Sequence, residues 1–147
     1  MFSITKTFEF EASHKLNLDY ESPCKKIHGH SYKVEITVES EGLDSNGMVI
    51  DFSELKDVKE KIMELWDHAL IMSQFDPNIG TFRDLAATRG IIKLAELPQD
   101  NVTAEHMAKF IHNETYHCLR EKGFNVRNMN IQVSIWETSN NKATYRA

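Results

Sequence analysis

The clearest structural signal in the chain is His28-Gly-His-Ser-Tyr-Lys-Val-Glu-Ile-Thr-Val-Glu39. Histidine and apolar side chains alternate here with polar ones, which is the period of a half-buried β-strand. The same alternation runs from Phe2 to His14 and predicts another strand. Because turn residues fill Gly42 to Gly47, we expect the chain to return through Met48–Ile50 as a hairpin.

The middle of the chain has the periodicity of two amphipathic helices. The first is expected to start near Ser53, with Asp51 as its cap, because apolar residues then recur every three to four positions. The second spans about Thr103 to Lys122. Between them, Ser73 to Asp100 has no clear period, and Ile91 to Leu97 is interpreted as one or two helical turns.

Alternation returns from Arg127 to Glu137 and predicts a third strand, and we expect a short final strand at about Lys142 to Arg146. The expected order is therefore ββααββ. This order is typical of an α+β fold in which a four-stranded antiparallel sheet carries both helices on one face. Because an open sheet leaves two unpaired edges, we also expect a homo-oligomer.

Length and composition narrow the class of protein. The 147 residues suit one domain, and 17 basic against 22 acidic residues give a net charge of −5, which argues against a nucleic-acid partner. No apolar run approaches the ~20 residues that span a bilayer, so no membrane partner is expected. The N-terminus does not resemble a signal peptide, and Cys24 and Cys118 are the only cysteines. We therefore expect a cytoplasmic protein with reduced thiols.

Three histidines are predicted to meet at one end of the first two strands. His28 and His30 are two residues apart, so their side chains point to the same side of the strand. If the strands pair antiparallel, His14 lies beside them. Three neutral imidazoles leave a fourth tetrahedral position for water or substrate, as in catalytic zinc sites, although imidazole also suits iron, copper and nickel. The alternative is a group of hydrogen-bonded core histidines.

Three further features are candidates for chemistry. Cys24 lies four residues before His28 and beside two lysines, so it is a reactive thiolate, an ordinary loop cysteine or a fourth metal ligand. Asp67 and His68 follow the first helix, where a carboxylate can support an imidazole in proton transfer. Glu137 ends a strand; it can bind a guanidine-like edge through two parallel hydrogen bonds or remain a solvated acid.

Together these residues resemble the 6-pyruvoyl-tetrahydropterin synthase superfamily. The matching segments run in family order along nearly the whole chain: Phe-Glu-Phe-Glu-Ala-Ser-His (8–14), Cys-Lys-Lys-Ile-His-Gly-His-Ser-Tyr (24–32), Gly-Met-Val-Ile-Asp-Phe-Ser-Glu-Leu-Lys (47–56), Asp67-His68, Thr103-Ala-Glu105 and Glu137-Thr138. The resemblance implies one domain over residues 1–147 with the tunnelling fold. In that fold, sheets of several subunits surround a channel, usually in a hexamer, and the active sites lie between subunits.

The resemblance also implies the site residues. Zinc would be held by His14, His28 and His30. Cys24 would be the general base, with Asp67 and His68 as its proton relay. Glu137 would anchor the pterin ring, and Thr103 and Glu105 would line its pocket. The short spacing from Cys24 to His28 is similar to that of the bacterial 6-carboxy-5,6,7,8-tetrahydropterin synthases of the queuosine pathway. That branch converts 7,8-dihydroneopterin triphosphate to 6-carboxy-5,6,7,8-tetrahydropterin and releases acetaldehyde and triphosphate.

The same residues are compatible with other functions. The same site would serve a 6-pyruvoyl-tetrahydropterin synthase, which only eliminates triphosphate, or another pterin side-chain lyase or aldolase. A three-histidine zinc hydrolase and a metal-stabilised assembly protein are the alternatives from other classes. Lys15, Lys25 and Lys26 are the nearest cations for the triphosphate. The stretch Phe75 to Gln99 is longer than in compact bacterial members of the family.

Overall fold

The computed structural model, which describes residues 1–147, builds the chain around one mixed sheet. The six strands lie in the order β4-β3-β1-β2-β5-β6. Their bounds are β1 (Phe2–His14), β2 (His28–Ser40), β3 (Ala69–Ser73), β4 (Leu94–Leu97), β5 (Met129–Thr138) and β6 (Asn141–Arg146). The strands β1, β2, β5 and β6 are antiparallel neighbours, whereas β3 runs parallel to β1 and β4 parallel to β3.

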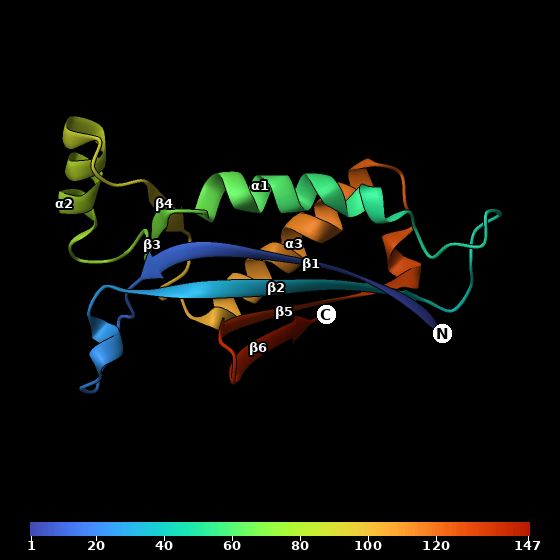
Figure 1. The fold of residues 1–147 in the computed structure, drawn as a ribbon, viewed down its shortest axis with the longest axis horizontal. Helices are drawn as coiled ribbons and strands as arrows, with labels where there is room; N and C mark the ends of the chain where they lie inside the picture. The colour runs from blue at the N-terminus through green and yellow to red at the C-terminus, as the bar shows by residue number, and fades with distance from the viewer.

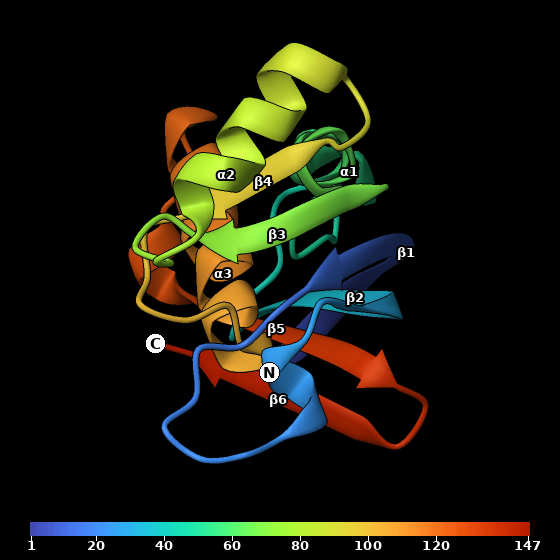
Figure 2. The same ribbon diagram turned by 90° about the vertical axis from the view of Figure 1, so that its left-hand side faces the viewer.

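Two long helices, α1 (Lys56–Trp66) and α3 (Ala104–Glu121), lie on the same face of this sheet (Figure 1). Their apolar sides and the inward-facing residues of β1, β2 and β5 form one core. A short helix, α2 (Ile79–Asp84), lies apart from the two long helices. It packs against β3 and β4, at the edge of the sheet that β4 forms (Figure 2). The α+β class and the placement of both long helices on one face are confirmed.

The predicted four-stranded antiparallel sheet with the order ββααββ is wrong, because β3 and β4 add a parallel pair at one edge. All five residues of β3, Ala-Leu-Ile-Met-Ser, are buried, so the strand has no polar face and no period of two. The strand β4 occupies part of Ile91–Leu97, where helical turns were expected. Met48–Ile50 forms bends and no returning strand.

The helix ends follow from local sequence. The Asp51 carboxylate accepts a hydrogen bond from the Ser53 amide at 2.7 Å and caps the 3₁₀ turn Phe52–Leu55 that leads into α1. Thr103 is the N-cap of α3, and its hydroxyl accepts from the amide of His106. Gly123 follows α3 with φ +90°, a left-handed conformation that glycine adopts without strain. None of the helices has the length and apolar character to span a bilayer.

Candidate metal centre

The predicted histidine site forms where β1 ends and β2 begins. The two strands pair antiparallel with His14 opposite His28 and Ala12 opposite His30. One ring nitrogen from each histidine lies within 4.8 Å of the others. The ring centroids are 4.7 Å apart for His14 and His28, and 4.9 Å apart for His28 and His30. Strand register alone therefore brings the three imidazoles together.

Hydrogen bonds to the backbone fix the orientation of two of these rings. The Nδ1 atom of His14 is 2.9 Å from the carbonyl oxygen of Val102, and that of His28 is 2.7 Å from the carbonyl oxygen of Lys26. Because a carbonyl only accepts, each Nδ1 must carry the proton, and each Nε2 then presents a lone pair. Metal-bound histidines are held in this way.

The residues fit a metal ion by a second criterion. The Nε2 atoms of His14 and His30 are buried and have no hydrogen-bond partner within the protein. Buried polar atoms without partners are costly and call for an explanation, and a metal ion at the meeting point supplies one. If these were ordinary core histidines held by hydrogen bonds, the two Nε2 atoms would have partners within the protein, and they have none.

Burial keeps two of the three histidines neutral. It lowers the pKa of His14 to about 4, although the Val102 carbonyl raises it in part. Burial also lowers the pKa of His30, against the opposing effect of the nearby Glu137 charge. The neighbouring Tyr32 is fully buried, and burial raises the pKa of its phenol far above the ordinary value. At neutral pH, His14 and His30 are therefore neutral imidazoles beside a neutral phenol.

Glu137 lies next to the histidines. A register irregularity between Trp136 and Thr138 leaves Glu137 without a partner on β6, as a β-bulge does. Its carboxylate Oε1 is 3.6 Å from Nε2 of His14. The bulge thus directs an acidic side chain from β5 to the same place as the histidines from β1 and β2.

Asp67 and His68 form a pair at the end of α1. The Nδ1 atom of His68 is 2.9 Å from the Asp67 carboxylate, which also accepts the Glu11 amide at 3.0 Å. These hydrogen bonds hold the pKa of Asp67 below its ordinary value, so the carboxylate stays ionised. The backbone of His68 has φ +60°, which is uncommon for a residue other than glycine. His68 and His30 line the same groove of about 540 Å³.

Cys24 lies in the loop that joins β1 to β2, within the 3₁₀ turn Pro23–Lys25. Its carbonyl accepts the Leu16 amide at 2.9 Å, and the residue is half-buried. The thiol is not part of the three-nitrogen cluster, so the four-ligand site that the sequence left open is not formed. Cys24 also does not line the groove that contains His68.

Two other predicted pocket residues lie at the start of α3. Thr103 follows Val102, whose carbonyl orients His14, and Glu105 is exposed in the first turn of the helix. Sequence reasoning did not identify Val102, because any residue type provides a backbone carbonyl. The period of two does place Tyr32 on the same face as His28 and His30, and its buried ring lies beside the rings of His14 and His30.

Comparison with known proteins agrees with this geometry. The 6-pyruvoyl tetrahydropterin synthase family matches residues 3–147. A 6-carboxy-5,6,7,8-tetrahydropterin synthase of Aquifex aeolicus is 35% identical over 159 aligned residues, which cover 99% of this chain and 98% of that protein. Two solved structures share the fold. An uncharacterised protein of Wolinella succinogenes has a TM-score of 0.79 at 21% identity over 99% of this chain and 97% of its own. A 6-pyruvoyl tetrahydropterin synthase of Plasmodium falciparum has a TM-score of 0.75 at 20% identity over 99% and 98%. The chain therefore belongs to the 6-pyruvoyl tetrahydropterin synthase family of lyase-type enzymes.

Proposed function

We propose that this protein is a zinc-dependent 6-carboxy-5,6,7,8-tetrahydropterin synthase. It would convert 7,8-dihydroneopterin triphosphate to 6-carboxy-5,6,7,8-tetrahydropterin, with release of acetaldehyde and triphosphate, in queuosine biosynthesis. The observation that carries the proposal is the cluster of His14, His28 and His30 with Glu137 beside it. The name and the 35% identity of the Aquifex relative support the carboxy branch over the pyruvoyl branch.

The roles of the ligands and of Glu137 follow from their positions. His14, His28 and His30 would hold the zinc ion, which when bound acts as a Lewis acid on an oxygen of the substrate side chain. The Glu137 carboxylate, aimed at this place by its bulge, would accept two hydrogen bonds from the amino and ring N–H edge of the pterin. Thr103 and Glu105 at the start of α3 would line the pterin pocket.

Cys24 would remove a proton from the substrate side chain, and His68, held by Asp67, would carry that proton onward. The Asp67–His68 hydrogen bond supports the second role. Within one chain, however, Cys24 does not line the groove of His68. A homohexamer with active sites between subunits would bring the thiol of one subunit to the relay of the next. The unpaired edges of β4 and β6 are available for such assembly, and sedimentation of the purified protein tests it.

The triphosphate requires positive charge near the site. Of the three lysines considered above, Lys15 is engaged in an ion pair with Asp76. The Lys25 ammonium forms an ion pair with the highly exposed Glu21, and such surface pairs are weak. We therefore assign the binding of the triphosphate to Lys25 and Lys26, in the loop that carries Cys24. We also expect the protein to act in the cytoplasm.

Product analysis tests the proposal. Zinc-loaded protein is incubated with 7,8-dihydroneopterin triphosphate, and acetaldehyde and pterin products are quantified. We expect acetaldehyde and 6-carboxy-5,6,7,8-tetrahydropterin in equal amounts, with a loss of at least about 100-fold in the Cys24→Ala variant. A Cys118→Ala variant is the matched control and should retain activity.

Three results would change the assignment. A 6-pyruvoyl product without acetaldehyde would establish the pyruvoyl synthase instead. No turnover of any pterin, together with pterin binding that is insensitive to Glu137→Gln, would favour a zinc hydrolase. If Cys24→Ala had no effect and His30→Ala only unfolded the chain, the metal would be structural.

A further inference from the structure

The Val102 carbonyl orients the most buried ligand of the metal centre, yet it belongs to no helix or strand. His14 is 0% exposed, and its Nδ1–H donates to this carbonyl at 2.9 Å. Val102 lies in the irregular segment between β4 and α3. Its carbonyl is therefore not positioned by a hydrogen-bond ladder, and another contact must fix it.

The side-chain amide of Asn101 provides that contact. Its Oδ1 accepts two backbone N–H groups, from Asn17 at 3.0 Å and from Val102 at 3.1 Å. Its Nδ2 donates to the carbonyl of Asn17 at 3.0 Å. Asn101 thus acts as a clamp that joins the segment after β1 to the segment before α3, one residue from the carbonyl that holds His14.

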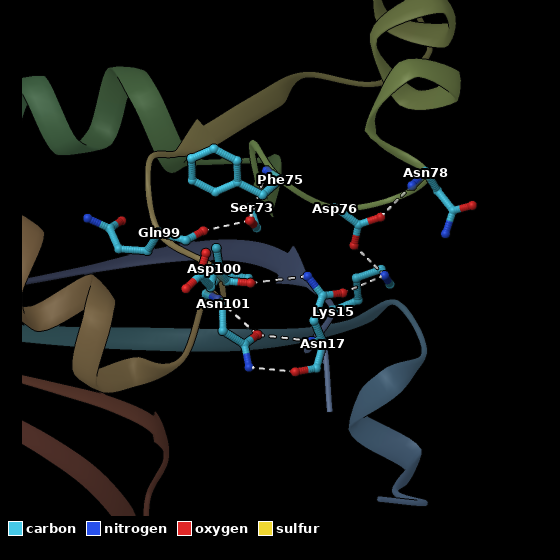
Figure 3. Close-up of polar contacts among 10 residues, drawn as sticks. Lys15, Asn17, Ser73, Phe75, Asp76, Asn78, Gln99, Asp100 and Asn101 are labelled. Carbon is cyan, nitrogen blue, oxygen red and sulfur yellow. Dashed lines mark hydrogen bonds and ion pairs between the residues drawn. The ribbon is translucent and has the colours of Figure 1, made fainter. Parts of the chain in front are cut away.

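The side chain of Asn17 makes further contacts that hold this clamp in place (Figure 3). The side-chain Nδ2 of Asn17 donates to the carbonyl of Asp100 at 3.3 Å, and its Oδ1 accepts from the Lys15 ammonium at 3.0 Å. Lys15 also pairs with Asp76, whose side chain is 1% exposed. The Asp76 carboxylate accepts the Asn78 amide at 2.8 Å. The clamp is thereby connected to the turn after β3.

We propose that Asn101 is a positioning residue of the metal centre, acting on His14 through the backbone of Val102. The inference depends on the proposed metal centre and not on the pterin chemistry. Loss of the amide would free the Val102 carbonyl to move, and His14 would then populate the other tautomer and rotated ring positions. Outer hydrogen-bond partners of metal ligands contribute about 10–100-fold to metal affinity, and because Asn101 acts one bond further out we expect about tenfold.

The test compares zinc affinity between variants, measured by competition with a chromophoric chelator and without any substrate. Asn101→Ala should bind zinc about tenfold more weakly than the wild type. Asn101→Asp keeps both accepted hydrogen bonds, loses the donated one and preserves the shape, so its loss should be smaller. Asn78→Ala is the matched control, because the Asn78 side chain makes no capping hydrogen bond, and its zinc affinity should not change.

A spectroscopic readout separates positioning from general destabilisation. In metal-free wild-type protein, ¹⁵N correlation spectra should show His14 as the Nδ1–H tautomer only, and in Asn101→Ala a mixture. If the wild type binds zinc tightly and both Asn101 variants have the same zinc affinity and the same His14 tautomer as the wild type, the role of Asn101 is overturned. The proposed metal centre would not be affected by that result. Absence of zinc binding in the wild type would overturn the metal centre and the inference with it. If Asn101→Ala fails to fold, Asn101→Asp decides by the same two measurements.

Discussion

The ion pair between Lys15 and Asp76 gives the sharpest prediction for stability. The Lys15 ammonium contacts the Asp76 carboxylate, and their side chains are 15% and 1% exposed. The Asp76 carboxylate accepts one further hydrogen bond, from the backbone amide of Asn78. The Lys15 ammonium has one further acceptor, the side-chain oxygen of Asn17. Removing the lysine therefore leaves a buried carboxylate, whereas removing the acid leaves an ammonium that is closer to solvent.

The two single substitutions should differ because of this asymmetry. Breaking a buried pair by removing one partner costs about 3–5 kcal/mol, and we expect Lys15→Met to fall in this range. Asp76→Asn keeps an oxygen for the Asn78 amide and leaves Lys15 one partner, so we expect about 1–3 kcal/mol. The double variant Lys15→Met/Asp76→Asn removes both charges and should cost less than the sum, with a coupling of about 1–3 kcal/mol.

Urea unfolding of metal-free protein, followed by circular dichroism, measures these free energies. Lys56 and Glu60 form an exposed pair on α1 and are the matched control, so Lys56→Met should cost less than about 1 kcal/mol. A cost of Lys15→Met as small as that of the control would contradict the reasoning. It would also return Lys15 to the candidates for the triphosphate.

Three further predictions concern the core, a helix cap and pH. Trp66 is 1% exposed and packs between Phe10 and Phe110, so Trp66→Ala should lower the unfolding free energy by about 3–5 kcal/mol. Thr103→Ala removes the N-cap of α3 and should cost about 1 kcal/mol, measured in the same assay. Burial lowers the pKa of His112, so the unfolded chain binds its proton more readily. Its contribution to stability is complete above about pH 6.5 and is lost as the pH falls below that value, and His112→Leu should make this dependence shallower.

Each of these predictions has a contrary result. A Trp66→Ala variant that unfolds like the wild type would mean that the ring is not packed in the core. A Thr103→Ala variant less stable than the wild type by several kcal/mol would mean that Thr103 does more than cap the helix. Stability that rises as the pH falls below about 6.5 would contradict the sign argued for His112.

The cluster of three histidines could be predicted because it depends on two regular features. Side chains alternate along a strand, so His28 and His30 share a side. Antiparallel pairing of consecutive strands then brings the end of β1 to the start of β2, and the register places His14 opposite His28. The cap at Asp51 was equally local and lies at its expected position, and α3 (Ala104–Glu121) lies within one residue of each predicted end, Thr103 and Lys122.

Features that depend on distant backbone could not be predicted in this way. The strand β3 is buried on both faces and lacks a polar period, and its parallel partner β4 comes more than twenty residues later in the chain. The approach of Glu137 to His14 depends on a bulge in β5, which no residue pattern announced. The supporting carbonyl of Val102 carries no side-chain signal at all.

Zinc-edge X-ray absorption of the zinc-loaded wild-type protein would identify the atoms that bind the ion. If His14, His28 and His30 hold the ion, we expect three imidazole nitrogens at about 2.0–2.1 Å and one further oxygen or nitrogen ligand, with no sulfur. A sulfur shell at about 2.3 Å, or fewer than three imidazoles, would contradict it.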